Sequence, residues 1–406
     1  MSEGGRVCPI CDMVTDETVC PDDKVPTVDR NMLDQRWEDR LKPGMMIANR
    51  FRVEGFLGGG SMGGVYHCIQ VNMQRPVALK TLKQEFMSDS KMLKRFYLEA
   101  RAASRLDHPN IVRVYDFGVD EEHEVPYIAM EYLIGDDMRT MLYHRERLPE
   151  REAAYLVSQI VKALVNAHEN GIVHRDLKPA NIHIRQMSGG DVHCKVLDFG
   201  IAKVLQGNDE STSNLTGTGM AMGTALYMSP EQILGKPVDF RTDLYAVGCI
   251  LYELCSGETP FAGEDVAVLV RHLDESIPEL PDKLVDGEKP TDAIRYVLGR
   301  LMAKDPAERP GSTANVALAL ECLARGEPVD MKNLLDSTVP DPDPHAENPD
   351  VVMPMGDATA ATMAQGVISA DAAAGMAGRA EAGSLQGGGG TVAWDSVDPP
   401  LGSDSA

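Results

Sequence analysis

The chain carries HRDLKPAN at residues 174–181 and LDFG at residues 197–200, with two short alternating runs between them. The runs, at 182–185 and 192–197, flank a Gly-Gly pair at 189–190. Alternating runs joined by a glycine turn are the pattern of a β-hairpin. Because a hairpin brings its far end back to its beginning, the sequence predicts that the two quoted motifs meet in space.

Polar side chains gather at this predicted meeting point. Asn181, just before the first run, should lie beside Asp198, just after the second. Amide and carboxylate oxygens are hard ligands that suit Mg²⁺. Asp176 lies on the same loop, where its carboxylate can accept a proton from an incoming hydroxyl, and Lys178 can neutralise charge on a phosphoryl group. These residues predict a site for phosphoryl transfer.

The two motifs, in this order and at this distance, resemble the catalytic and magnesium loops of the protein kinases, in particular those of bacterial eukaryotic-like Ser/Thr kinases. Either motif alone would also fit a chance polar loop around a hairpin. The resemblance covers about residues 48–325 and implies an α+β, protein-kinase-like bilobal fold, with a small β-rich lobe holding one key helix and a larger, mainly helical lobe. It implies transfer of the γ-phosphoryl group of ATP, with Mg²⁺, to Ser/Thr hydroxyls of protein substrates.

A glycine-rich stretch, LGGGSMGGVY at residues 57–66, lies between two strand patterns and precedes VALK at residues 77–80. A lone glycine triplet is a weak indication of a nucleotide site. Here the glycines can let a turn backbone approach the phosphates of ATP, Val65 can cover the adenine, and Lys80 can pair with the α/β-phosphates. Read alone, Lys80 could be a solvated strand lysine. The resemblance implies these ATP-binding residues: Leu57, Gly58, Gly59, Gly60, Ser61, Met62, Gly63, Val65, Ala78, Lys80, Met130, Glu131 and Leu133.

Residues 88–106 have helical spacing and end before His108-Pro109, which stops a helix. Glu99 lies on this helix, at the position that pairs with the strand lysine in the kinase family. Without the family it could be an exposed glutamate among arginines. The catalytic residues implied by the resemblance are Asp176, Lys178, Lys80 and Glu99.

Strands at 111–114 and 127–130 are predicted to complete the small lobe. After them, Met130 resembles the gatekeeper residue of kinases. Residues 131–133 resemble the hinge whose backbone hydrogen-bonds the adenine.

Two helices are predicted to build the core of the larger lobe. One is long and amphipathic, with Pro149 near its start and Gly171 past its end. The other is strongly apolar, at 244–255, and Thr242-Asp243 opens it. Asp243 could be an ordinary N-cap. The resemblance adds a hydrogen bond from its carboxylate to the catalytic-loop backbone, and both roles can hold at once.

Residues 201–222 are polar and rich in Ser, Thr, Gly and Asn, which predicts a mobile loop. The loop leads to GTALYMSPE at residues 223–231, which resembles the substrate-docking segment of Ser/Thr kinases, with Ser229 in place of the usual alanine. In the kinase family, Thr224 and Lys178 together mark the Ser/Thr branch.

Arg175 precedes the catalytic base, so this loop is expected to need a phosphate to order it. Thr216 and Thr218 are the predicted acceptors, and together with Thr224 they form the activation-loop set. Further along, KDPAERP at residues 304–310 resembles the late kinase motif whose arginine, Arg309, pairs with the glutamate at the end of the docking segment.

Composition limits the remaining possibilities. The 406 residues carry a net charge of −23, and residues 326–406 hold 13 acids against two basic residues, a net of −11. We therefore expect no nucleic-acid partner. There is no uncharged apolar run of 18 residues and no signal-peptide pattern, so we expect a cytoplasmic protein without a membrane span. The predicted layout is a knuckle at 1–23, a linker at 24–47, the kinase domain at 48–325, and an acidic, low-complexity, disordered tail at 326–406.

The knuckle reads CPICDMVTDETVCPDD from residue 8. Cys8, Cys11 and Cys20 have a spacing that suits structural Zn²⁺, with Asp23 as the fourth ligand. The segment resembles the zinc-ribbon-like knuckles that precede some bacterial kinases. A disordered tail or a redox-active thiol pair are the alternatives.

The interpretation favoured by the sequence is an active kinase whose partners are ATP and protein substrates, with self-association for trans-autophosphorylation left open. A pseudokinase scaffold that acts through the knuckle and the tail is the main alternative. A small-molecule kinase on the same fold fits less well, because the 223–231 segment is typical of protein substrates.

Overall fold

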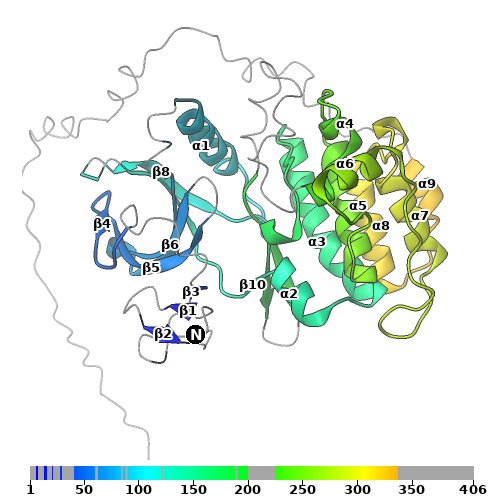
Figure 1. Cartoon of the computed structure of the whole chain (residues 1–406), viewed down its shortest axis with the longest axis horizontal. Coiled ribbons are helices and arrows are strands. Elements are labelled where there is room, and N and C mark those ends of the chain that lie inside the picture. Colours follow the sequence, from blue (N-terminus) through cyan, green and yellow to red (C-terminus); the bar gives the residue numbers. More distant parts are fainter. Residues whose placement is uncertain are drawn as a thin grey trace, which may run out of the picture. The chain divides into compact units, whose positions relative to one another are not determined.

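The computed structural model describes residues 6–7, 13–15, 21, 28–29, 41–59, 63–83, 86, 90–120, 122–123, 125–187, 191–199 and 225–336. These residues build a bilobal α+β fold, with a sheet-rich small lobe and a mainly helical large lobe (Figure 1). The fold class predicted from the sequence is confirmed.

The small lobe is built on a six-stranded antiparallel sheet in the order β4-β5-β6-β7-β9-β8. Burial alternates along the first half of β5, and β7 is buried from Val77 to Leu79, so the sheet packs on a core that includes Phe51 and Leu79. Helix α1 (Ser90–Ala103) packs on the sheet through Phe96 and Ala100. The strands are β4 (Met46–Ile47), β5 (Phe51–Gly59), β6 (Gly64–Gln70), β7 (Arg75–Thr81), β8 (Val114–Asp120) and β9 (Val125–Glu131), and the turn η3 (Val71–Met73) links β6 to β7.

The strand predicted at 111–114 is wrong. The structure starts β8 at Val114 and continues it to Asp120. Ile111 instead forms a parallel bridge to Val196, outside the six-stranded sheet. The sequence did not indicate β8 because the strand contains two polar residues, Asp116 and Asp120. Asp120 is tolerated there because it is buried and accepts the Ala48 N–H at 2.7 Å.

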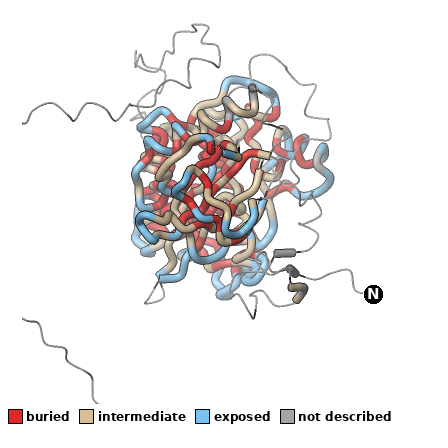
Figure 2. Tube along the Cα trace, turned by 90° about the vertical axis from the view of Figure 1, so that its left-hand side faces the viewer, coloured by how far each residue is buried: buried red, intermediate tan, exposed pale blue. Residues whose placement is uncertain are grey.

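The large lobe is centred on α3 (Glu150–Glu169) and α5 (Arg241–Ser256), whose side chains are mostly buried. Figure 2 shows the buried residues of the chain, in red, gathered inside the fold. Pro149 directly precedes α3 and Gly171 follows it with φ +71°, as predicted. The other helices are α2 (Met138–Arg145), α4 (Pro230–Ile233), α6 (Asp265–Asp274), α7 (Asp292–Leu301), α8 (Thr313–Arg325) and α9 (Met331–Asp336), with short turns η7 (Ala225–Tyr227) and η8 (Pro306–Glu308).

The predicted hairpin is confirmed. Strand β11 (Ile182–Gln186) pairs antiparallel with β12 (Val192–Val196), and β10 (Asp136–Asp137) adds to its other edge. The turn η5 (Pro179–Asn181) directly precedes β11. The backbone of Leu197 donates to the carbonyl of Asn181 at 2.8 Å, so the two ends of the hairpin do meet.

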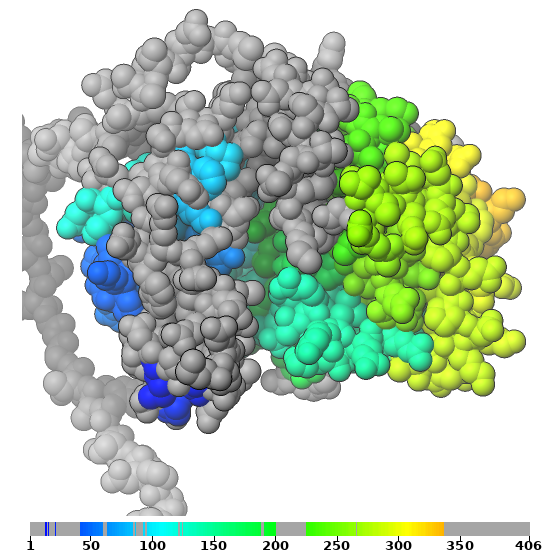
Figure 3. All heavy atoms as spheres, in the orientation of Figure 1, coloured from blue at the N-terminus to red at the C-terminus, as the bar shows by residue number. Residues whose placement is uncertain are grey.

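Packing extends past both ends of the 48–325 span predicted for the kinase domain. Ile47 is fully buried in the core of the small lobe. Met331 and Leu335 of α9 are buried on the large lobe, although order was expected to fade after residue 325. The spheres of α9 are orange in Figure 3.

A separate sheet of two-residue strands, in the order β2-β1-β3, lies near the N-terminus of the chain. Its strands are β1 (Arg6–Val7), β2 (Val14–Thr15) and β3 (Val28–Asp29). Cys8, Cys11, Cys20 and Asp23 lie outside the described residues, so the predicted zinc site is not seen.

The cysteines that the structure describes are reduced and buried. Burial raises the pKa of Cys68, Cys194 and Cys255 to about 12, because it disfavours the thiolate. Within the described part of the chain, no helix is both long enough and apolar enough to cross a membrane.

Gly248 lets α5 approach the chain at the end of α7. A Cβ built on Gly248 would lie 2.6 Å from Met302 Cγ and 3.0 Å from Leu301 Cβ. We predict that Gly248→Ala lowers the free energy of unfolding by about 1–3 kcal/mol through overpacking. Gly299 on α7 has open space around it, so Gly299→Ala should instead add about 0.5–1 kcal/mol. Urea unfolding measures both, and equal effects of the two substitutions would contradict the packing argument.

Candidate active site

The catalytic loop, residues 174–181, is held by one buried carboxylate. Asp243 Oδ2 accepts the backbone N–H of His174 at 2.8 Å, and Asp243 Oδ1 accepts that of Arg175 at 2.8 Å. The N-cap role considered for Asp243 is wrong, because α5 begins earlier and Phe240 is its N-cap. The predicted bond to the catalytic-loop backbone is the role that the structure shows.

A histidine from α3 completes the environment of this carboxylate. His168 Nε2 lies 2.9 Å from Asp243 Oδ2, and His168 Nδ1 lies 2.9 Å from Thr313 Oγ1. Burial alone would raise the pKa of the Asp243 carboxyl, but the hydrogen bonds from His168 and from the Arg175 backbone help to outweigh it and lower the pKa. Asp243 therefore stays ionised while fully enclosed. No sequence motif pointed to His168, although it follows Val161 and Leu164 by seven and four residues on the buried face of α3.

Two residues of the site have left-handed backbone conformations. Arg175 has φ +63° and Asp198 has φ +46°. Non-glycine residues rarely adopt such angles, which cost of order 1–3 kcal/mol and persist where surrounding contacts hold them. Both angles are thus imposed by the fold around the site.

Asp176, Lys178 and Asn181 lie together on the loop, as their spacing predicted. Lys178 Nζ is 3.0 Å from Asp176 Oδ2. Asn181 Nδ2 donates to the backbone carbonyl of Asp176 at 2.8 Å and lies 3.3 Å from Asp176 Oδ2. With the amide nitrogen used in this way, Oδ1 is the Asn181 atom that can coordinate a cation.

Lys80 joins the two lobes. Its Nζ lies 2.7 Å from Glu99 Oε1 on α1 and 2.8 Å from Asp198 Oδ1, which follows β12. Burial alone would lower the pKa of the Lys80 ammonium, but the two carboxylates outweigh it and raise the pKa. Lys80 is therefore a fixed positive charge, and neither the solvated-lysine nor the exposed-glutamate alternative describes this pair.

The glycine-rich stretch is described at its two ends only. Gly63 needs to be glycine, because a Cβ there would lie 1.6 Å from the carbonyl oxygen of Thr81. Val65 is paired with Lys80 across β6 and β7, so both lie at the same level of the sheet. Leu57, Gly58 and Gly59 end β5, whereas Gly60, Ser61 and Met62 lie outside the described residues.

The predicted adenine-binding residues lie on neighbouring strands. Ala78 of β7 is paired with Met130 of β9. Glu131 donates its N–H to the Arg113 carbonyl at 2.9 Å, and its carboxylate forms an ion pair with Lys195 at 2.9 Å. These contacts fix the start of the predicted hinge.

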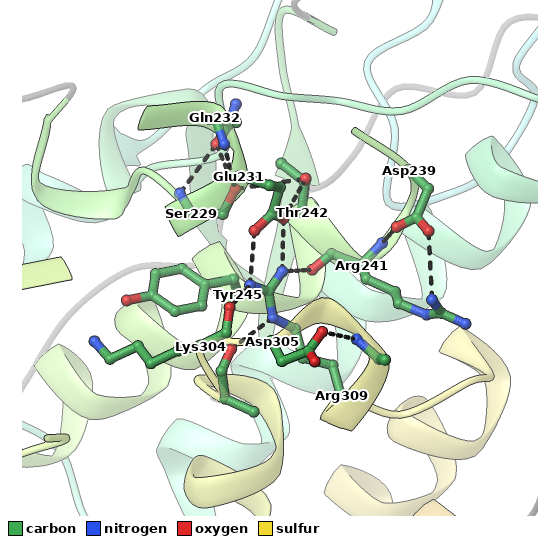
Figure 4. Close-up of polar contacts among 12 residues, drawn as sticks. Ser229, Glu231, Gln232, Asp239, Arg241, Thr242, Tyr245, Lys304, Asp305 and Arg309 are labelled. Carbon is green, nitrogen blue, oxygen red and sulfur yellow. Dashed lines mark hydrogen bonds and ion pairs between the residues drawn. The ribbon is translucent and has the colours of Figure 1, made fainter. Parts of the chain in front are cut away.

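The end of the docking segment is anchored in the large lobe (Figure 4). Glu231 forms a bidentate ion pair with Arg309, at 2.7 and 2.8 Å, and both side chains are almost fully buried. Thr242 Oγ1 donates to Glu231 Oε1 at 2.7 Å. Burial alone would raise the pKa of the Glu231 carboxyl, but Arg309 outweighs it and lowers the pKa. The predicted Glu231–Arg309 pair is confirmed.

A small hollow with a volume of about 10 Å³ lies between the catalytic loop and this segment. Asp176 and Lys178 line it from one side, and Tyr227, Met228 and Gln232 line it from the other. Arg175 also faces the hollow, and its Nε is buried without a hydrogen-bond partner among the described residues. Thr216, Thr218 and Thr224, the predicted activation-loop residues, lie outside the described residues.

Comparison with known proteins adds to this geometry. A family model described as "Protein kinase domain" matches residues 51–320. Serine/threonine-protein kinase pkn3 of Myxococcus xanthus is 42% identical over 270 residues, which make up 66% of this chain and 49% of the relative. Serine/threonine-protein kinase PrkC of Bacillus subtilis is 38% identical over 267 residues, 66% of this chain and 39% of the relative.

A solved structure is similar over the same part of the chain. The crystal structure of the Mycobacterium tuberculosis PknI kinase domain superposes with a TM-score of 0.51 at 30% identity, covering 70% of this chain and all of that one. This chain spans less than half the length of either pkn3 or PrkC. Because the family model matches well over half of the chain and the described residues form both lobes, the chain belongs to the protein kinase domain family.

Proposed function

We propose that this chain is a protein serine/threonine kinase, which transfers the γ-phosphoryl group of ATP to hydroxyl groups of protein substrates. The observation that carries the proposal is the Lys80 ammonium, held 2.7 Å from Glu99 Oε1 and 2.8 Å from Asp198 Oδ1. A partly buried cation that joins the glycine-rich sheet to the catalytic loop is placed where nucleotide phosphates need positive charge. The curated relatives reported above carry the same activity in their names.

The donor atoms around the catalytic loop fit Mg²⁺. Asp198 offers a carboxylate that is about half exposed, and Asn181 offers Oδ1. Hard oxygen donors with room for water and phosphate are the usual magnesium ligands. When bound, Mg²⁺ neutralises charge on the nucleotide phosphates.

The residues of the chain supply positioning, charge and a proton acceptor. The substrate hydroxyl oxygen bonds to the γ-phosphorus as the bond to the β,γ-bridging oxygen breaks, and that oxygen keeps the electron pair in ADP. The hydroxyl proton passes to the carboxylate of Asp176. Lys178 lies 3.0 Å from that carboxylate and brings positive charge to the transferring group.

We also propose that the activation loop is controlled by autophosphorylation, for which self-association would bring two copies together. The Arg175 guanidinium supports this proposal. It is more than half buried, burial lowers its pKa while Asp243 opposes this, and its Nε lacks a partner among the described residues. A phosphate from the loop would supply strong acceptor oxygens to this group. ATP as a substrate fits the cytoplasmic location predicted from the sequence.

We propose further that the N-terminal knuckle binds structural zinc. Its support is the position of the cysteines along the chain: Cys8 directly follows β1, and Cys11 lies between β1 and β2. Strand turns that carry Cys-x-x-Cys pairs are typical of zinc ribbons, and Cys20 and Asp23 would complete four ligands. A segment this short has little core of its own, so metal would be its main source of stability.

The catalytic assignment predicts that Asp198→Asn and Lys80→Met each lower phosphoryl transfer by at least about 100-fold. The first removes the negative charge that would hold Mg²⁺, and the second removes the charge beside the phosphates. Transfer of labelled phosphate from ATP to casein measures the effect, and circular dichroism should show unchanged folding. Asp282→Asn and Lys283→Met, at exposed positions, are the matched controls. Near wild-type transfer by either site variant would refute the assignment.

The activation-loop proposal predicts that the active protein carries phosphate on Thr216, Thr218 or both. Mass spectrometry should detect it, and the Thr216→Ala/Thr218→Ala double variant should be much slower, because Arg175 then lacks an acceptor. Ser211, Thr212 and Ser213 are competing acceptors that the same spectra resolve. A fully active wild type without phosphate on this loop would contradict the proposal.

The zinc proposal predicts about one zinc per chain in protein prepared without a histidine tag. Elemental analysis should show that the metal is lost in the Cys8→Ser/Cys11→Ser variant, because two of four ligands are gone. Kinase activity should survive deletion of residues 1–40. A wild type without zinc under reducing conditions, or a variant that keeps it, would rule out the site.

A further inference from the structure

Gln232 of α4 uses both ends of its amide. Its Oε1 accepts the backbone N–H of Ser229 at 3.1 Å, which closes a capping box around the start of the helix. Its Nε2 donates to the backbone carbonyl of Arg175 at 2.8 Å. One side chain therefore connects the docking segment directly to the catalytic loop.

The chemistry of the partners fixes the orientation of this amide. The backbone N–H of Ser229 can only donate, and the carbonyl of Arg175 can only accept. A side chain that satisfies both at once must carry an acceptor and a donor at the same end. Glutamine does so, whereas glutamate keeps the acceptor and loses the donor.

The carbonyl that Gln232 binds belongs to the peptide group between Arg175 and Asp176. The N–H of Arg175 is held by Asp243 at 2.8 Å, and Arg175 itself has a left-handed backbone. Asp243 thus fixes one side of this residue and Gln232 fixes the other. The residue after this peptide is Asp176, the proposed proton acceptor. The orientation of the peptide therefore helps to set the position of the Asp176 carboxylate.

Helix α4 is itself firmly held (Figure 4). Ser229 is fully buried, and Glu231 is bound by Arg309 and Thr242. Gln232 therefore extends from a fixed base, and its bond to Arg175 can transmit the position of the docking segment to the loop.

We propose that Gln232 is a positioning residue, which sets the peptide before Asp176 and so couples the docking of a protein substrate to the placement of the proton acceptor. The proposal deepens the proposed kinase function and rests on it. A small displacement of a reacting group can cost about 100-fold in rate. We therefore expect loss of this hydrogen bond to lower kcat while ATP binding is unchanged.

The test uses Gln232→Glu in the full-length chain. Glutamate preserves the capping box, which accepts either residue at this position, but places a carboxylate against the Arg175 carbonyl. With casein as the acceptor, kcat should fall about 10- to 100-fold and KM for ATP should stay within about twofold. Hydrogen exchange of the peptide covering 174–181 should become faster, which reports loop position without any need for activity.

Gln74→Glu is the matched control. Gln74 Nε2 also donates to a backbone carbonyl, that of Val71, at 2.7 Å, but in the exposed turn between β6 and β7. This variant should keep wild-type kcat and loop exchange. If Gln232→Glu has loop exchange and kcat like those of the control, the positioning role is refuted. If the wild type transfers no phosphate, the kinase proposal fails. The positioning role is tested separately, because unchanged hydrogen exchange of residues 174–181 in Gln232→Glu would overturn it even then.

Discussion

The ionised carboxylate of Asp243, enclosed in the large lobe, is the constraint on which the rest of the site depends. A buried charge is costly unless hydrogen bonds compensate it. Here the compensation comes from His168 on α3 and from the backbone N–H groups of His174 and Arg175. If the catalytic loop moved away, the Asp243 carboxylate would be left buried without these hydrogen bonds. The geometry of the site is therefore coupled to the stability of the helical core.

The small lobe is joined to this core by charge. Glu99 stands on α1, whose position depends on the packing of Phe96 and Ala100 against the sheet. Lys80 connects that helix to Asp198, which the hairpin returns to the loop. A displacement of α1 would take Glu99 away from Lys80 and so change the charge balance around Asp198.

Motif spacing predicted the hairpin, the two lobes, the pairing of Glu231 with Arg309 and the placement of Asp176 with Lys178, because each depends on local patterns or on a family with fixed geometry. It misplaced the strand that begins at Val114, since burial of Asp120 follows from a partner distant in sequence. The motifs also gave no indication of the role of Gln232, and Ser229 was read only as a small replacement for the usual alanine. The spacing S-x-x-Q at 229–232 is a readable capping signal, but the carbonyl of Arg175 that the glutamine also binds lies 57 residues away and leaves no local pattern.

The buried thiols can also report on unfolding. Cys68 lies in the small sheet, Cys194 in the hairpin, Cys249 and Cys255 in α5, and Cys322 in α8. Since only an exposed thiolate reacts with an alkylating reagent, each of these residues stays silent until its own layer opens. The time at which each of these cysteines becomes alkylated during unfolding would therefore report the order in which the small sheet, the hairpin, α5 and α8 open.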